Sequence, residues 1–93
     1  MIKLLVADDE HLVRQALVSL LSLQEDFEII GQAANGEQAV NTALDAGADV
    51  VLMDIQMPIM DGVAATALIK QQRPATQVLS ARLVLRTGCP KIG

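Results

Sequence analysis

Three aspartates stand where they could share a metal ion. Asp8 and Asp9 follow an apolar run at residues 2–7, and Asp54 follows a second apolar run at 49–53. If these runs form neighbouring parallel strands, their carboxyl ends meet and bring the three carboxylates together. Carboxylates this close do not all stay ionised without a cation between them. Because every ligand is an oxygen, the pattern favours a hard divalent ion, Mg²⁺ above all.

The same residues predict a reaction. A carboxylate beside bound Mg²⁺ can act as a nucleophile toward phosphorus and form an aspartyl phosphate, while the metal neutralises the phosphoryl oxygens. Acids before a helix also have a simpler role, because they stabilise its N-terminus through the macrodipole. We expect that role for Glu10, and we expect Asp61-Gly62 to be a turn and helix start rather than a ligand.

Strand and helix patterns alternate along the chain. Short apolar strands separated by helical stripes require parallel strands with helices on both faces, which is an α/β doubly wound architecture. Gly47 stands where a helix-ending glycine belongs, and Pro74 closes the third helix. The expected strands are 2–7, 27–32, 49–53 and one opening at 77–79, and the expected helices lie near 12–21, 39–44 and 63–72.

Composition excludes several classes of protein. At 93 residues the chain forms one domain at most, and 52% hydrophobic residues exclude general disorder. The apolar runs are too short to span a bilayer, and Asp8 interrupts the first before it reaches signal-peptide length, so we expect a cytoplasmic protein that does not bind membranes. Its single cysteine, Cys89, permits no internal disulfide and is expected to be a surface thiol.

Charge is distributed unevenly along the chain. All 11 acidic residues but only four of the seven basic ones precede residue 80, so residues 1–79 carry −7 and residues 80–93 carry +3. An acidic body repels phosphate backbones, and the basic end is too short to reverse this. We therefore expect no nucleic-acid binding by this chain itself.

Two motifs resemble a known family. Val6-Ala7-Asp8-Asp9-Glu10 and Met53-Asp54-Ile55-Gln56-Met57-Pro58-Ile59-Met60-Asp61-Gly62 are similar to the receiver domain of bacterial two-component response regulators, especially receivers that precede a LuxR/NarL-type helix-turn-helix DNA-binding domain. The resemblance spans residues 2 to about 79. It implies a flavodoxin-like sheet with strand order 2-1-3-4-5, of which this chain supplies 2-1-3-4 and lacks the fifth strand and last helices.

The resemblance assigns roles to the site residues. It implies that Asp54 is the phosphoacceptor and that Mg²⁺ is held by Asp9 directly, by Asp8 partly through water, by Asp54 and by the backbone carbonyl of Gln56. The phosphoryl donor would be a phosphohistidine on a sensor histidine kinase. The domain would be no enzyme in the ordinary sense, since it would catalyse only its own phosphorylation. In the family, phosphorylation alters the faces that control dimerisation and DNA binding, and the full regulator controls transcription.

The resemblance ends near residue 79, which divides the chain into a receiver at 1–79 and an atypical basic tail at 80–93. Arg82 stands at the expected hydroxyl position, Ser80 comes two residues early, and Lys91 comes too soon to be the family lysine. Neither the hydroxyl nor the lysine is carried over. We therefore expect weak Mg²⁺ binding and slow, poorly transmitted phosphorylation.

The tail also bears on assembly and on alternative functions. Leu83-Val84-Leu85 is expected to add an antiparallel strand or to pair with another chain, which predicts a homo-oligomer such as a dimer formed by swapping. One alternative function is a haloacid-dehalogenase-like phosphohydrolase, but Asp8-Asp9-Glu10 lacks the Asp-x-Asp spacing of that class. The other is a receiver-like fragment that only dimerises, without phosphotransfer.

Overall fold

The computed structural model describes residues 1–88, so the expectations for Cys89 and Lys91 fall outside the described residues. Strands and helices alternate along this part of the chain. The strands are β1 (Ile2–Ala7), β2 (Phe27–Ala33), β3 (Val50–Met53) and β4 (Gln77–Ser80). The helices are α1 (His11–Ser22), α2 (Gly36–Ala46), α3 (Gly62–Gln72) and α4 (Ala81–Thr87).

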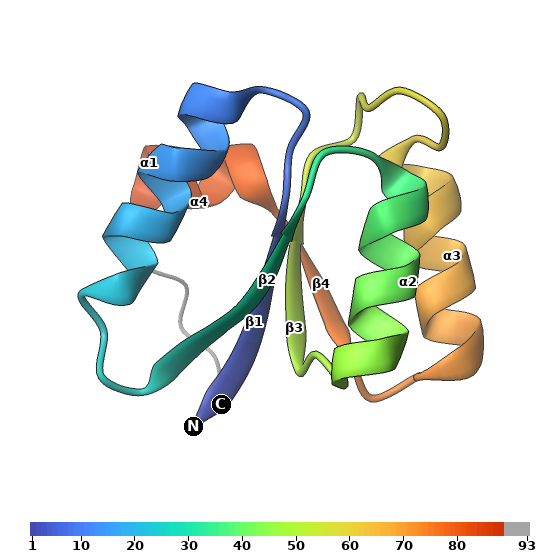
Figure 1. Ribbon diagram of the computed structural model, residues 1–93, viewed down its shortest axis with the longest axis horizontal. Helices are drawn as coiled ribbons and strands as arrows, with labels where there is room; N and C mark the ends of the chain where they lie inside the picture. The colour runs from blue at the N-terminus through green and yellow to red at the C-terminus, as the bar shows by residue number, and fades with distance from the viewer. Residues whose placement is uncertain (89–93) are drawn as a thin grey trace.

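The strands form one parallel sheet in the order β2-β1-β3-β4 (Figure 1). Strand β1 pairs with β2 on one side and with β3 on the other, and its register against β3 runs from Leu4 opposite Val50 to Ala7 opposite Met53. This confirms the predicted α/β doubly wound fold and its strand order. It also meets the condition on which the metal site depended, namely that the first and third strands are neighbours.

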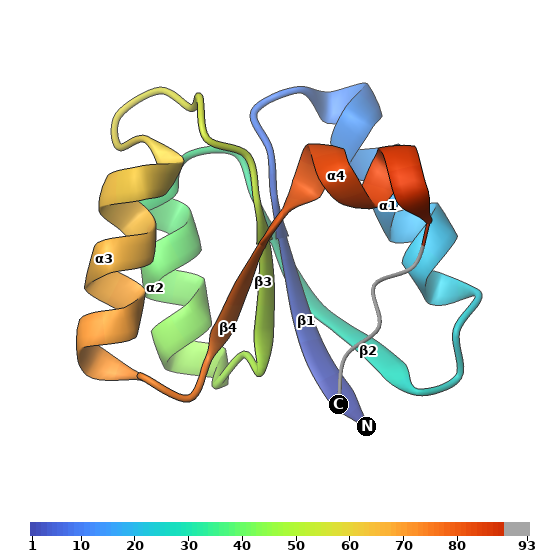
Figure 2. The same ribbon diagram turned by 180° about the vertical axis from the view of Figure 1, so that it is seen from behind.

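Helices cover both faces of the sheet. Helices α2 and α3 lie on one face and α1 and α4 on the other (Figures 1 and 2). Side chains of a strand alternate between the two faces of the sheet, so β1 and β3 contribute side chains to two separate hydrophobic cores. The core under α2 and α3 includes Leu5, Ala7, Val51, Met53, Ala65 and Ile69, and the core under α1 and α4 includes Leu4, Val6, Leu17, Leu21, Val50, Leu52, Ala81 and Val84.

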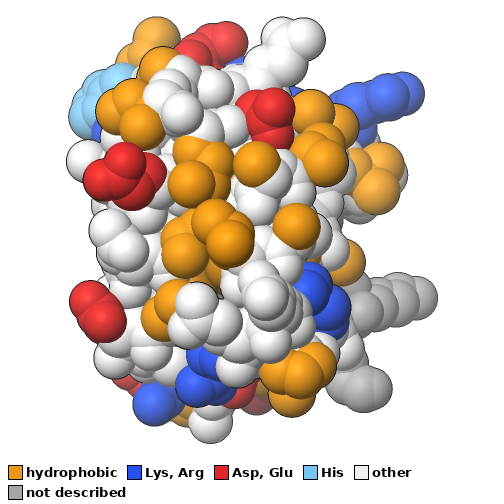
Figure 3. All heavy atoms as spheres, turned by 90° about the vertical axis from the view of Figure 1, so that its right-hand side faces the viewer, with side chains coloured by type: hydrophobic (Ala, Val, Ile, Leu, Met, Phe, Trp, Pro, Cys, Tyr) orange, Lys and Arg blue, Asp and Glu red, His pale blue; other side chains and the backbone are white. Residues whose placement is uncertain are grey.

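Helix α2 is closed at both ends, and Gly47 has the role that the sequence predicts for it. The side chain of Asn35 accepts a hydrogen bond of 2.8 Å from the backbone N–H of Gln38 and caps α2. Gly47 ends α2 in the left-handed conformation at φ 68°, which costs glycine little. On the outer side of α2 and α3, hydrophobic side chains gather between charged ones (Figure 3). Within residues 1–88 we found no helix with the length and hydropathy of a membrane span.

The expectation of an added strand at Leu83-Val84-Leu85 is wrong, because this segment belongs to helix α4. Its apolar residues follow helical spacing: Ala81 and Val84, three apart, are 0% and 4% exposed, whereas Leu83 and Leu85 are 54% and 38% exposed. Ser80 caps the helix by accepting a hydrogen bond of 3.3 Å from the N–H of Leu83. Helix α4 packs beside α1 on the same face of the sheet (Figure 2).

Candidate functional site

The carboxyl ends of β1 and β3 hold the three aspartates in place. Asp8 and Asp9 directly follow β1, and Asp54 directly follows β3. The backbone N–H of Asp8 donates to the carbonyl of Ala33 at 3.0 Å, and that of Asp54 donates to the carbonyl of Ala7 at 2.9 Å. Sheet hydrogen bonding therefore continues into the acidic residues themselves, and the position of Asp8 and Asp54 is set by the most buried strands of the fold.

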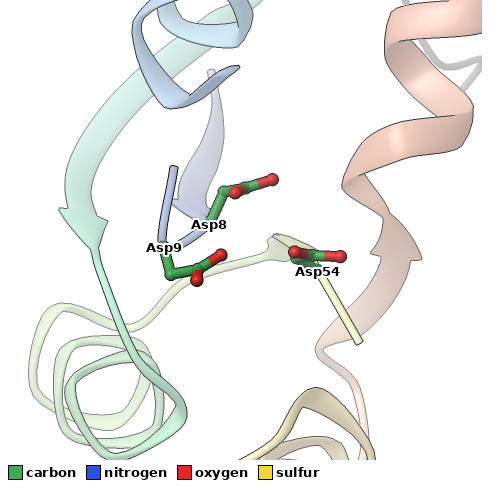
Figure 4. A group of neighbouring side chains, drawn as sticks. All are labelled: Asp8, Asp9 and Asp54. Carbon is green, nitrogen blue, oxygen red and sulfur yellow. The ribbon is translucent and has the colours of Figure 1, made fainter. Parts of the chain in front are cut away.

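The three side chains turn toward one space (Figure 4). Asp8, Asp9 and Asp54 each offer a carboxylate oxygen, and these oxygens lie within 4.8 Å of one another. Asp8 is fully buried, the side chain of Asp54 is 13% exposed, and Asp9 is exposed. The structure thus brings together the aspartates that the sequence predicted would meet. Gln56 lines the same open cavity of about 510 Å³ as Asp9 and Asp54.

The loop after Asp54 packs closely against the first turns of two helices. Gly62 donates its N–H to the carbonyl of Ile55 at 2.7 Å, and a Cβ at Gly62 would lie 2.1 Å from the carbonyl oxygen of Asp54. Only glycine allows α3 to begin this close to the backbone of Asp54. The side chain of Asp61 accepts a hydrogen bond of 2.8 Å from the N–H of Ala64, which confirms the predicted helix start.

Arg82 is a member of the site that sequence reasoning did not assign. Its Nε lies 3.1 Å from Oδ2 of Asp8, and its Nη2 lies 3.1 Å from Oε1 of Glu10 and 3.4 Å from Oδ2 of Asp54. Its position in the sequence could have indicated this, because Arg82 comes two residues after Ser80, the last residue of the strand beside β3. Glu10 lies at the N-cap of α1, the helix-terminal position expected for it; its side chain makes no capping hydrogen bond and pairs with Arg82.

Burial and charge act in opposite directions on Asp8. Burial raises the pKa of its carboxyl group, and the negative charge of Asp54 adds to this, while a hydrogen bond from the N–H of Glu10 and the charge of Arg82 lower it. The pKa of the Arg82 guanidinium is raised, chiefly by its hydrogen bond to Glu10. Within residues 1–88, Asp8 Oδ2 and Arg82 Nε have no aligned hydrogen bond although they are an ion pair at 3.1 Å.

These groups fit a hard divalent cation. Three carboxylates supply the oxygen ligands that Mg²⁺ prefers, and the buried Oδ2 of Asp8, which forms an ion pair with Arg82, accepts no aligned hydrogen bond among residues 1–88. Exposed Asp9 leaves one side open to solvent, where waters could complete an octahedron. The site can therefore concentrate positive charge around the carboxylate of Asp54.

Comparisons with known proteins agree with this geometry. The family model described as the response regulator receiver domain matches residues 4–82. The transcriptional regulatory protein LnrK of Bacillus subtilis is 44% identical over 79 residues, which are 85% of this chain and 36% of LnrK. The chain therefore spans about a third of the length of this relative.

Solved structures share the fold. The response regulator domain of Thermotoga maritima CheB is 36% identical with a TM-score of 0.80, over 84% of this chain and 57% of that one. A DNA-binding response regulator of the LuxR family from Staphylococcus aureus is 35% identical with a TM-score of 0.78, over 84% of this chain and 65% of that one. The chain thus belongs to the response regulator receiver domain family, and its relatives are regulators of the LuxR/NarL type.

Proposed function

We propose that this chain is a phosphoacceptor domain in which Asp54 receives a phosphoryl group in the presence of Mg²⁺. The observation that carries the proposal is the convergence of carboxylate oxygens from Asp8, Asp9 and Asp54 within 4.8 Å at the tips of β1 and β3. The receiver family generally binds Mg²⁺ at an acidic pocket and is a signalling family rather than a classical enzyme family. Family membership therefore favours phosphotransfer over a haloacid-dehalogenase-like hydrolase.

The donor in the proposed reaction is a phosphohistidine of a sensor histidine kinase. A carboxylate oxygen of Asp54 attacks phosphorus and forms an O–P bond while the N–P bond to the histidine breaks. The histidine nitrogen keeps the electron pair of the broken N–P bond. Because the other ring nitrogen carries a proton, the histidine side chain is released as a neutral imidazole. Asp54 suits this role because its side chain is 13% exposed at the rim of an open cavity, where a partner protein can reach it.

The other site residues prepare Asp54 for this step. Asp8, Asp9, Asp54 and the backbone carbonyl of Gln56 would hold Mg²⁺, which would neutralise the phosphoryl oxygens during transfer. Asp8, buried and fixed by the sheet, gives the cluster a rigid side, and exposed Asp9 gives it an open one. Gly62 keeps α3 close to the backbone of Asp54, so the nucleophile is held by β3 before it and by α3 after it.

Acetyl phosphate tests the proposal without a kinase. Incubation with Mg²⁺ should add one phosphoryl group to the wild-type chain, seen by intact mass and by a Phos-tag gel. Asp54→Asn should abolish labelling, whereas Asp45→Asn, which removes an exposed carboxylate on α2, should leave it unchanged. EDTA should suppress labelling of the wild type. Labelling that survives in Asp54→Asn would contradict the assignment, and no labelling of any variant would favour a domain that only dimerises.

Further parts of the proposal concern the longer protein. Since relatives such as LnrK extend well beyond the matched region, we propose a regulator in which this receiver controls a LuxR-type DNA-binding domain in the cytoplasm. Homo-oligomerisation stays a prediction. Strand β4 is an edge of the sheet formed by the described residues, and such an edge can pair with a second copy. Size-exclusion chromatography with light scattering tests it, and a monomer alone would count against it.

A further inference from the structure

The cation that neutralises the carboxylate cluster in this structure is part of the chain. Arg82 extends from the first turn of α4 to contact Asp8, Glu10 and Asp54. Two of these contacts join segments more than 70 residues apart in the sequence, since the separations are 74 residues to Asp8 and 72 to Glu10. The guanidinium therefore meets the acidic pocket because α4 begins directly after β4 and packs beside α1.

Arg82 occupies the oxygens that a divalent cation needs. Its Nε faces Oδ2 of Asp8 at 3.1 Å and its Nη2 reaches Oδ1 of Asp8 at 3.3 Å, so both oxygens of the buried carboxylate are engaged. Its Nη2 also lies 3.4 Å from Oδ2 of Asp54. A divalent cation bonded to the same oxygens would lie close to the positively charged guanidinium. The two positive charges would repel each other at such a short separation.

We propose that Arg82 is a tethered counter-ion that competes with the divalent cation for Asp8 and Asp54, so that metal binding requires the guanidinium to leave these carboxylates. The inference rests on the proposed function, because it takes the three aspartates as the metal site. It assigns to Arg82 control over the affinity of that site. In the absence of metal, Arg82 relieves the repulsion between carboxylates that the fold forces together.

The surroundings allow Arg82 to be displaced. Its side chain is 42% exposed, while that of Asp8 is fully buried, so the cation can withdraw into solvent and the carboxylate cannot. Among the described residues, Asp9, the exposed member of the cluster, forms no ion pair with Arg82 and stays open to an incoming ion. Four acidic side chains surround one guanidinium here, so the acidic groups outnumber the basic one and the cluster still attracts a divalent cation.

Isothermal titration with MgCl₂ tests the competition. Arg82→Gln keeps most of the aliphatic stem but removes the charge, and it should bind Mg²⁺ about fivefold to tenfold more tightly than wild type, allowing for the exposure of the pair. Arg82→Lys should fall between the two, because it keeps a charge but loses the planar fork. Arg86→Gln is the matched control: it removes the same charge from an exposed position of the same helix, and it should change the affinity less than twofold.

A second measurement needs no variant. In the wild-type chain, the Arg82 Nε–Hε resonance should shift on addition of Mg²⁺ as the guanidinium leaves Asp8, and the resonance of Arg86 should not follow it. An unmoved Arg82 resonance in a chain that binds Mg²⁺ would overturn the inference, even if the substituted chains failed to fold. Equal or weaker Mg²⁺ affinity in Arg82→Gln would also overturn it.

The outcomes separate this inference from the proposed function. If wild type and Arg82→Gln bind Mg²⁺ equally and Asp54 is still labelled by acetyl phosphate, the role of Arg82 fails and the phosphoacceptor site stands. If neither chain binds Mg²⁺, the metal site fails and the competition fails with it.

Discussion

The two sides of the acidic pocket are held very differently. Its carboxylates come from β1 and β3, the central strands, where the residues from Leu4 to Ala7 and from Val50 to Met53 are no more than 3% exposed. Its cation comes from α4, a seven-residue helix after the edge strand β4, and only Ala81 and Val84 of that helix are buried. The negative charges are therefore fixed by the central strands, while the positive charge lies on a short helix with two buried residues.

This difference indicates that Arg82, rather than Asp8 or Asp54, moves when the site binds a metal ion. Moving Asp8 or Asp54 would break sheet hydrogen bonds to Ala33 or Ala7, whereas moving Arg82 requires only a change of side-chain rotamer or a small shift of α4. Regions with few buried apolar contacts open at lower free energy than the core. Substitutions that loosen one side of the pocket at a time test this difference.

The largest effect is expected in the centre. Leu52→Ala on β3 removes a fully buried side chain and should lower the free energy of unfolding by about 2–5 kcal/mol, measured by urea denaturation. Leu12→Ala, on a leucine that is 81% exposed, is the matched control and should change it by less than about 0.5 kcal/mol. A similarly small loss in Leu52→Ala would show that the central strands are not the rigid side of the pocket.

A smaller effect is expected on α4. Val84→Ala should cost about 1–2 kcal/mol, since a smaller side chain is removed and alanine favours the helix. Because it loosens the helix that carries Arg82, it should also tighten Mg²⁺ binding in the same direction as Arg82→Gln. Leu83→Ala, on an exposed leucine of the same helix, is the matched control and should change neither the free energy of unfolding nor the affinity for Mg²⁺. A cost as large as that of Leu52→Ala would mean that α4 is held as firmly as the sheet.

The smallest effect is a pH-dependent gain from Asp8→Asn in EDTA. Since burial raises the pKa of Asp8 in the folded state, its protonated form favours folding. That stability is present below the ordinary pKa of 3.8 and is lost as the pH rises through the raised value. The neutral amide of Asn does not lose stability in this way, so Asp8→Asn should be more stable than wild type near pH 7. The gain in the free energy of unfolding should be less than about 1 kcal/mol, because the variant also weakens the pairing with Arg82.

Urea denaturation across pH 3–8 measures this gain, with Asp45→Asn as the control for removing one exposed carboxylate. The difference between Asp8→Asn and wild type should shrink as the pH falls toward 3.8. A variant that is less stable than wild type at neutral pH, or a gain that grows on acidification, would mean that the ion pair with Arg82 outweighs the burial of Asp8.

Much of the fold was predictable because its signals are local. Alternating apolar runs and helical stripes predicted every described element up to Ser80, and Gly47 and Asp61 marked a helix end and a helix start. The segment Leu83-Val84-Leu85 was misjudged because three adjacent apolar residues fit a strand or a helix equally well. Its true state depended on Val84 meeting the core under α1, a contact that no local pattern records.

The meeting of Asp8, Asp9 and Asp54 could be predicted from the amino-acid sequence, because parallel strands bring their carboxyl ends to one edge and an acid follows each of the two strands. The contact of Arg82 with Asp8 and Asp54 depends instead on how the helices pack on the sheet. Its partners lie more than 70 residues away in sequence at Asp8 and Glu10, and their distances depend on the direction in which α4 leaves β4. That direction is set by the burial of Ala81 and Val84 against the α1 face, which is a property of the assembled core.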